Sequence, residues 1–288
     1  MKLALGTVQF GLQYGVANKR GQVPLAEVGQ IIALARSKGM DTLDTAIAYG
    51  DSEQRLGEVG MEAWRVVSKL PPLPEDCPDV RRWVIGSVEG SCQRLRQRSL
   101  HGLLLHQPSQ LKQRHGDALY RALQDLKQAK IVEKIGISVY SPAELEVLES
   151  HPCDLVQVPF NAVDVRLVDS GWMRRLSHMG VELHVRSVFL QGLLLMSRES
   201  RPPVFGKWSA LWQAWDAYLR ETHQSPLQAC LRHVLSFNEI GRVIVGVDSL
   251  TQLNEIINAS QGAYQALPTA LKVDDPDLLN PSRWPVVA

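Results

Sequence analysis

The sequence has few of the features that mark disulfide-rich, zinc-binding or membrane-spanning proteins. Only four of its 288 residues are cysteines, Cys77, Cys92, Cys153 and Cys230, and none of them forms a CxxC pair. We therefore expect neither a disulfide framework nor a metal site, and the reduced thiols of a cytoplasmic protein instead. The longest apolar runs have the length of a strand, so no transmembrane helix is expected.

An excess of charge is also missing, because 31 basic residues are balanced by 30 acidic ones. No net field is present to attract nucleic acid or an anionic membrane surface. The first residues resemble a signal peptide only briefly, since Gly6, Thr7 and Gln9 interrupt the apolar run. The sequence thus predicts no nucleic-acid or membrane partner, and it leaves the oligomeric state open.

Short apolar runs alternate with helical patterns along the whole chain. The runs predict strands at residues 2–6, 41–44, 65–69, 102–106, 134–138, 155–158, 181–186 and 243–246. The intervening segments predict helices at residues 25–38, 53–59, 80–98, 117–129, 141–148, 168–179, 225–237 and 249–259. This alternation favours an α/β fold, a single (β/α)₈ (TIM) barrel over residues 1–288. An open doubly wound sheet is the alternative, but LGTVQFGLQYG after the first strand lacks its GxGxxG spacing.

Two segments are additions to the eight strand–helix units of a minimal barrel. Residues 191–222 form a long loop after the seventh strand, and residues 262–288 form a C-terminal extension. We expect both to shape the mouth of a pocket, or the tail to cover the barrel exterior. Within the long loop, the helical spacing of Trp208, Trp212 and Trp215 favours a packed helix face over a substrate wall.

Four polar residues lie at or just beyond the ends of successive predicted strands, namely Asp44, Tyr49, Lys69 and His106. In a β/α barrel such positions share one face, so their side chains are expected to converge. A phenol has a pKa of about 10, which a nearby cation lowers. Lys69 can supply this charge with Asp44 as its partner, and His106 can bind a carbonyl group. Singly, each residue also has a structural interpretation, such as a helix cap for the aspartate.

The chain resembles the aldo-keto reductase superfamily along nearly its whole length. The most specific segment is LDTAIAYGDSEQRLGE at residues 43–58, and LGTVQFG, VVSKL, LLLHQP, QVPFN and IVGVDSLTQLNEI add to it. The resemblance implies reduction of an aldehyde or ketone, sugar-derived in some cases, by direct hydride transfer from NAD(P)H. It implies that Tyr49 is the general acid, that Lys69 and Asp44 tune it, and that His106 orients the carbonyl group.

The resemblance also implies which residues hold the cofactor. Ser138 and Gln157 match residues that hold the nicotinamide carboxamide, and Arg186 replaces an aromatic ring that stacks on the nicotinamide. The complete predicted set is Gly6, Thr7, Asp44, Ser138, Gln157, Arg186, Ser187, Leu190, Gly192, Gly246, Ser249, Gln252 and Glu255.

The choice between the two nicotinamide cofactors stays open. The resemblance favours NADP(H), but no lysine or arginine lies among Gly246, Val247, Asp248 and Gln252 to bind a 2′-phosphate. Asp248 would repel that group, so NAD(H) is the alternative. Two other functions also stay open: an NAD(P)-linked sugar or polyol dehydrogenase working in reverse, and a non-catalytic subunit that senses the cofactor. The arginines at residues 94–98 are expected on a solvated helix face, and Tyr14 either borders the substrate or packs.

Overall fold

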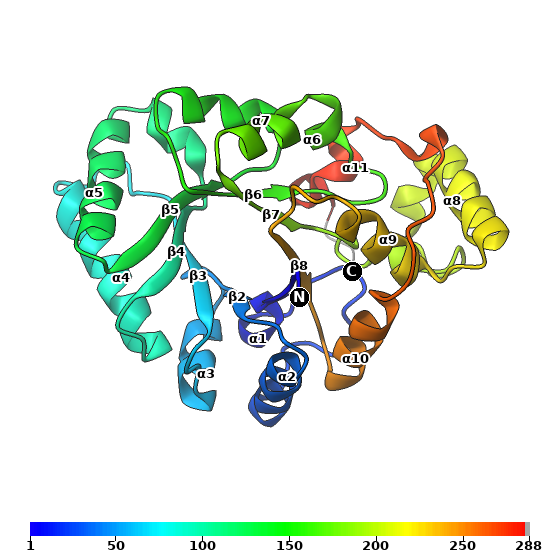
Figure 1. The fold of residues 1–288 in the computed structure, drawn as a ribbon, viewed down its shortest axis with the longest axis horizontal. Helices are drawn as coiled ribbons and strands as arrows, with labels where there is room; N and C mark the ends of the chain where they lie inside the picture. Colours follow the sequence, from blue (N-terminus) through cyan, green and yellow to red (C-terminus); the bar gives the residue numbers. More distant parts are fainter. Residues whose placement is uncertain (286–288) are drawn as a thin grey trace.

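The protein, as a computed structural model describing residues 1–285, is a closed barrel of parallel strands surrounded by helices (Figure 1). The strands follow one another in chain order, and β1 (Leu3–Gly6) pairs with β8 (Arg242–Gly246) to close the barrel. Between them lie β2 (Thr42–Asp44), β3 (Arg65–Leu70), β4 (Leu100–Leu105), β5 (Val132–Ser138), β6 (Leu155–Pro159) and β7 (Glu182–Arg186). The predicted (β/α)₈ fold is confirmed, and all eight predicted strands are present with slightly shifted ends.

Burial of both faces of the strands explains why the sequence shows them as continuous apolar runs. Barrel strands are covered by side chains on the inside and by helices on the outside, so both alternating faces are apolar. Every residue of β1, β2 and β6 is buried. The polar residues Asp44 and Gln157 within these strands are therefore exceptions that require buried partners.

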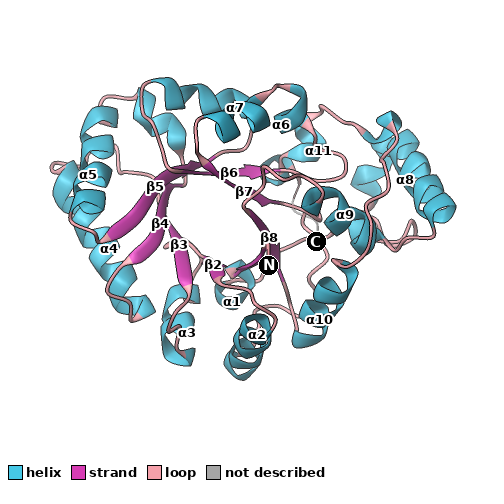
Figure 2. Cartoon of the chain, in the orientation of Figure 1, coloured by secondary structure: helices cyan, strands magenta, loops and turns pink. Residues whose placement is uncertain are grey.

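Amphipathic helices cover the outside of the barrel (Figure 2). They are α2 (Leu25–Ser37), α3 (Ser52–Val59), α4 (Val80–Leu95), α5 (Gly116–Gln128), α9 (Pro226–Leu235) and α10 (Leu250–Ala259), with the short α1 (Val8–Gly11) and η1 (Pro108–Lys112) in loops. The starts of these helices follow local signals: Asp79 caps α4 and Ser225 forms a capping box with Gln228 at α9. No helix within residues 1–285 is long and apolar enough to cross a membrane.

Two predicted helices differ from the observed ones in type or continuity, and the helix predicted at 80–98 ends early, at Leu95, because Arg96 is left-handed at φ 52°. Residues 141–148 were expected to be α-helical but form the 3₁₀ helix η2 (Pro142–Glu149), although the predicted capping box of Ser141 and Glu144 is present. A capping box satisfies the first amides of either helix type and does not select between them. The predicted helix at 168–179 is interrupted by Gly171 at φ 78°, which separates α6 (Arg166–Asp169) from α7 (Trp172–His178).

The long segment after β7 contains its own helices, η3 (Leu193–Leu195), η4 (Pro203–Trp208) and α8 (Ser209–Thr222). The predicted packed face is confirmed for Trp212 and Trp215, which α8 buries, whereas Trp208 ends η4 and is half-buried. The tail forms η5 (Thr269–Leu271), α11 (Pro276–Leu279) and η6 (Pro281–Arg283), and it runs beside α8 (Figure 1). Bonds from Tyr218 to Gln265 and from Trp208 to Asp275 attach it there. The last predicted tail residues, 286–288, lie outside the described part.

Candidate active site

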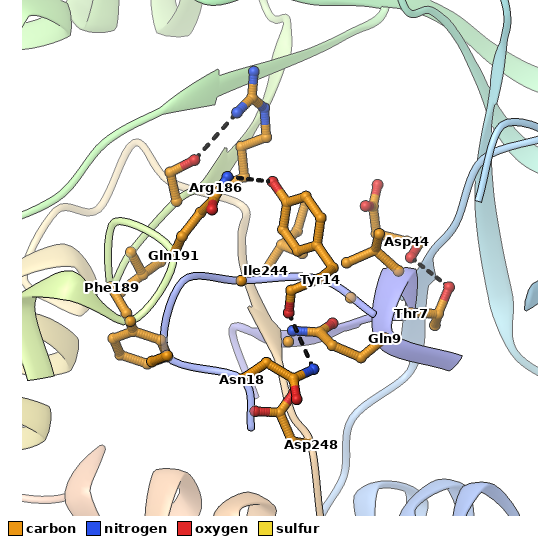
Figure 3. A pocket seen from close by; sticks show the side chains of 18 of the residues that line it. Thr7, Gln9, Tyr14, Asn18, Asp44, Arg186, Phe189, Gln191, Ile244 and Asp248 are labelled. Carbon is orange, nitrogen blue, oxygen red and sulfur yellow. Dashed lines mark hydrogen bonds between the residues drawn. The ribbon is translucent and has the colours of Figure 1, made fainter. Parts of the chain in front are cut away.

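A cavity of about 540 Å³ opens at the C-terminal ends of the strands. Its walls include Gly6 of β1, Asp44 of β2, Arg186 of β7 and Gly246 of β8, together with the loops that follow these strands. Figure 3 shows side chains from the loops after β1 and β7 meeting over this space. The C-terminal face is where β/α barrels assemble their functional groups.

A buried ion pair between Asp44 and Lys69 forms the floor of the site. The Lys69 ammonium donates to both carboxylate oxygens of Asp44 and to the carbonyl of Thr45, each at 2.8 Å. Gln157 Nε2 donates to Asp44 Oδ1 at 2.7 Å, and Ser138 Oγ donates to Gln157 Oε1 at 3.2 Å. Lys69 has no exposed surface and Asp44 is 4% exposed, so the charges are tolerable only because each is fully partnered.

The loop that carries Tyr49 is held in place by a close backbone approach. A Cβ atom at Gly11 would lie 1.8 Å from the Tyr49 carbonyl oxygen, and a Cβ at Gly50 would lie 2.4 Å from the Gly11 carbonyl oxygen. Only glycine permits this contact between α1 and the loop. The Tyr49 ring lies with its centroid 5.0 Å from Lys69 Nζ and 5.9 Å from the His106 ring, which it meets edge-on. Three of the four predicted catalytic side chains, all except Lys69, line the cavity.

The pKa of Tyr49 moves in the direction opposite to the expected one. Burial and the negative charge of Asp44 raise this pKa above its usual value, and the charge of Arg186 opposes the rise only in part. The expectation of a lowered pKa is therefore wrong for the free site, where the ammonium hydrogens of Lys69 are directed at Asp44 and the Thr45 carbonyl. The phenol is therefore protonated at neutral pH, which is the form that a proton donor needs.

His106 is neutral under the same conditions. Burial, followed by the positive charges of Lys69 and Arg186, lowers its pKa to about 4. A neutral imidazole can donate one hydrogen bond to a carbonyl oxygen without supplying a positive charge. Tyr49 and His106 thus place two neutral donors on the same side of the cavity.

The predicted cofactor residues fall into two groups. Lining the cavity are Gly6, Thr7, Asp44, Gln157, Arg186, Ser187, Gly192, Gly246, Gln252 and Glu255. The other three lie behind this lining: Ser138 bonds to Gln157, Leu190 is fully buried, and Ser249 caps α10 by accepting from the Gln252 amide.

The sequence did not predict several other residues that line the cavity, among them Gln9, Asn18, Tyr140 and Gln191. Gln191 Nε2 donates to Tyr14 Oη at 3.1 Å, which links the loops after β7 and β1 (Figure 3). Tyr14, for which the sequence left two interpretations, lines the cavity. Tyr140 follows the end of β5 by two residues, and that position was the one signal that would have identified it.

The end of the cavity beside β8 has buried polar atoms without hydrogen-bond partners and a glycine that leaves the backbone accessible. These features favour an elongated polar ligand. Among the described residues, Gln9 Oε1 and Asp248 Oδ1 are buried and accept no hydrogen bond. A Cβ at Gly246 would lie 2.6 Å from the Gln9 side-chain amide, so glycine keeps the backbone accessible there. A dinucleotide, with hydroxyl and amide donors along its length, fits such a lining. Residues 1–285 contain no cluster of side chains suited to a metal ion.

The N-terminus of α10, where Ser249, Gln252 and Glu255 are predicted to hold the cofactor, already binds a carboxylate. The Leu250 amide donates to Glu27 Oε1 at 3.0 Å, and Arg20 pairs with the other oxygen of Glu27 at 3.0 Å. Arg20 also donates to the Asp248 carbonyl at 2.9 Å. A helix N-terminus attracts anions, and here a side chain of the protein satisfies that preference.

The most specific segment of the sequence resemblance also carries structural residues. Glu53 of α3 is 2% exposed and accepts from Ser68 at 2.7 Å, from Ser91 at 2.6 Å and from Arg94 at 2.9 Å. The expected solvated face is confirmed, since Arg94, Arg96 and Arg98 are all exposed, and Arg94 also pairs with this buried carboxylate. A Cβ at Gly57 would lie 2.0 Å from the Arg94 carbonyl oxygen, so this glycine allows α3 to touch α4.

Comparisons with known proteins agree with this geometry. The model of the aldo/keto reductase family matches residues 2–266. The holo form of an aldo-keto reductase from Bacillus halodurans superposes with a TM-score of 0.72 at 18% identity, covering 92% of this chain and 88% of that one. A glycerol dehydrogenase from Gluconobacter oxydans gives 0.69 at 20% identity, covering 92% and 88%. A proposed aldo-keto reductase from Pseudomonas aeruginosa gives 0.66 at 22% identity, covering 90% and 89%.

No curated protein sequence matches the chain. The structural likenesses, at these low identities, concern the fold, whereas the family match rests on the sequence itself. The protein belongs to the aldo-keto reductase family and is an oxidoreductase of small carbonyl compounds.

Proposed function

We propose that the protein reduces an aldehyde or ketone, a sugar-derived one among the candidates, to an alcohol with NAD(P)H, and that Tyr49 is the general acid. The observation that carries this proposal is the convergence of a protonated phenol, a neutral imidazole and a buried ion pair at one end of an open cavity. The ion pair supports the phenol, and the cavity has room for both a cofactor and a small substrate.

The cavity lining offers positions for a nicotinamide dinucleotide. Gln157 bonds to Asp44 and Ser187 to Arg186, Gly6 and Gly246 pair between β1 and β8, and Gln252 belongs to α10. When bound in its reduced form, the nicotinamide supplies the hydride. The remaining chemistry, which is to bind the carbonyl group and to protonate its oxygen, belongs to the side chains of this chain.

His106 and Tyr49 act on the carbonyl oxygen in the proposed reaction. The imidazole N–H of His106 holds the oxygen, and the Tyr49 hydroxyl transfers its proton to the alkoxide as negative charge develops there. The phenolate left on Tyr49 lies over the Lys69 ammonium, 5.0 Å from ring centroid to Nζ, which favours the anion. Asp44 keeps Lys69 in position and balances its charge in the resting site. A proton from solvent then restores Tyr49 through the cavity mouth.

Local charge supports NAD(H) over the NADP(H) that the family resemblance favours. Glu27 occupies the amide of Leu250 at the start of α10, and Asp248 lines the cavity beside it. Arg20 is the nearby cation, and it is engaged with Glu27. A 2′-phosphate at this position would be repelled by the carboxylates of Glu27 and Asp248. Arg20 could not offset this repulsion, because it is already paired with Glu27.

A nicotinamide fluorescence titration followed by a panel of carbonyl substrates tests the proposal. We expect wild-type protein to bind a reduced cofactor and to turn over at least one carbonyl compound. Tyr49→Phe should lower kcat by about 100-fold or more with little change in cofactor Kd, because general acid catalysis of this kind contributes about 10²–10⁴. Tyr120→Phe is the control, since it removes a phenol hydroxyl bound to the Pro152 carbonyl outside the cavity. Turnover retained in Tyr49→Phe would remove Tyr49 as proton donor.

The reverse reaction is the second candidate, because one structural neighbour is named as a glycerol dehydrogenase. Rates measured in both directions, with each cofactor, separate a reductase from a polyol dehydrogenase. Tight cofactor binding without turnover of any compound would instead favour a sensing subunit.

A further inference from the structure

Arg186, at the end of β7, is a positive charge in the cavity without a carboxylate partner. Within residues 1–285, the partners of its guanidinium are neutral: Nη1 donates to Ser187 Oγ at 3.1 Å and Nη2 to the Val139 carbonyl at 2.9 Å. Its Cζ lies 4.6 Å from the centre of the Tyr140 ring. The side chain is half-buried, so water offsets its charge only in part.

Other charges in the lining do not compensate for Arg186. Asp44 is matched by Lys69, and the remaining acidic lining residues, Asp248 and Glu255, belong to the opposite end beside β8 and α10. Arg186 is the one lysine or arginine among the described lining residues. The cavity is therefore positive at its β7 end and negative at its α10 end.

The guanidinium lies close to the reacting groups. Its charge contributes to lowering the pKa of His106 and counteracts the raised pKa of Tyr49. An anion bound to Arg186 would consequently lie near a carbonyl group held by those two residues, within the dimensions of a small molecule.

The shape of the side chain suits a carboxylate or a phosphate. Tyr140 covers one face of the guanidinium and Val139 holds one nitrogen, so the orientation of the group is fixed in the free protein. Guanidinium has five N–H groups in a planar fork, and hydrogen bonds to Ser187 and Val139 occupy two of them, which leaves donors for an anion. A pre-oriented fork loses little entropy when it binds.

We propose that Arg186 binds an anionic group of the substrate, so that the preferred substrates are aldehydes or ketones that also carry a carboxylate or phosphate. This inference rests on the proposed function and narrows its substrate class. The cofactor supplies a second source of the same chemistry, since its pyrophosphate is also anionic, and the experiment separates the two.

Succinic semialdehyde and butyraldehyde are the probe substrates, because they have the same chain length and differ in the terminal carboxylate. We expect wild type to favour the acid in kcat/KM by about 10- to 100-fold, the value of a charge-assisted hydrogen-bonded pair. Arg186→Gln should reduce that ratio by about tenfold or more, and Arg186→Lys should retain part of it. Arg175→Gln is the matched control, because Arg175 also stacks on an aromatic ring, at 4.3 Å from Trp172, but lies outside the cavity.

Cofactor Kd, measured by nicotinamide fluorescence, is the second readout. An unchanged substrate ratio in Arg186→Gln overturns the proposal, and if cofactor Kd rises at the same time, Arg186 binds the pyrophosphate instead. Calorimetric titration with succinate needs no turnover and tests the anion site even if neither aldehyde is reduced. Succinate binding that is lost in Arg186→Gln supports the site; equal binding to both proteins, or none to wild type, overturns it.

Discussion

Lys69 faces the ring of Tyr49, at 5.0 Å from the ring centroid, while its ammonium hydrogens are directed at Asp44 and at the Thr45 carbonyl. The lysine thus contacts Asp44 through its ammonium hydrogens and the proposed general acid, Tyr49, through the face of its ring. In the resting site its charge is balanced by Asp44, and the phenol keeps its proton. Formation of a phenolate would add a second anion to the same ammonium.

Lys69→Met should therefore damage both stability and catalysis. Removing one partner of a buried ion pair typically costs about 3–5 kcal/mol, because the other charge stays buried and unpaired. We expect a loss of this size in the free energy of unfolding, measured with urea, and the loss of most turnover.

Lys127→Met is the matched control, because Lys127 pairs with Asp154 at a site where the two side chains are 42% and 32% exposed. Its cost should stay below about 1 kcal/mol, as for surface pairs in general. Equal costs for the two variants would show that burial does not set the strength of the Asp44–Lys69 pair.

Gly11→Ala should displace the Tyr49 loop. The new Cβ would lie 1.8 Å from the Tyr49 carbonyl oxygen, so α1 and the loop must separate. We expect kcat to fall by about tenfold or more and stability to fall by about 1–3 kcal/mol, as overpacking does elsewhere. Gly29→Ala in α2 is the control, since its Cβ meets nothing closer than Val59 at 3.8 Å. Wild-type kcat in Gly11→Ala would mean that the loop position is not critical.

The fold and the convergence of the four candidate side chains were predictable because both depend on local sequence. Apolar runs set where the strands end, and the polar residues at or just after those ends, such as Asp44 and His106, had to meet at one face of a parallel barrel. The spacing of Trp212 and Trp215 likewise fixed the packed side of α8. These inferences needed no knowledge of contacts between distant segments.

Contacts between distant residues could not be predicted. Glu27 reaches the amide of Leu250, and Gln191 reaches Tyr14, across separations of 223 and 177 residues. The raised pKa of Tyr49 follows from its burial and from the charge of Asp44, which depend on tertiary packing that a sequence does not specify. The pairing of exposed Arg94 with buried Glu53 was missed for the same reason, since the two residues lie on different helices.

Titration of His106 should not affect kcat/KM for carbonyl reduction near neutral pH. Its pKa of about 4 keeps the imidazole neutral at higher pH, and Tyr49 stays protonated there because its pKa is raised. We expect kcat/KM to vary little between about pH 5 and pH 8, where an unperturbed histidine would titrate. An inflection near pH 6.5 that disappears in His106→Gln would contradict the neutral role.

Glu27→Gln should shift cofactor preference towards NADPH. The change removes the carboxylate at the start of α10 and releases Arg20 to pair with a phosphate. We expect wild type to bind NADH more tightly than NADPH, and the ratio of the two Kd values to move by about tenfold in the variant, in line with one charge-assisted bond. Glu58→Gln, an exposed change on α3, should have no effect. Tighter binding of NADPH by wild type, with no response to Glu27→Gln, would refute this account.

His233 should make the protein less stable in mild acid. The residue is 4% exposed, neither ring nitrogen has a hydrogen-bond partner among the described residues, and its ring stacks on Phe160 at 5.3 Å. Burial lowers its pKa from 6.5 to about 4. Between pH 6.5 and about pH 4, the imidazole is protonated in the unfolded chain but not in the folded protein. The contribution of His233 to the free energy of unfolding is therefore complete above about pH 6.5 and declines as the pH falls towards 4.

The loss attributable to His233 should be on the order of 2 kcal/mol at about pH 4.5, and His233→Phe should remove it. Urea unfolding of both proteins at about pH 7 and pH 4.5 measures the difference. Some acid sensitivity will persist in the variant, because the lowered pKa of His106 acts in the same direction. The surface residue His178 provides the control, as His178→Gln should retain the wild-type loss. If His233→Phe loses as much stability on acidification as wild type does, burial of this imidazole is not the cause.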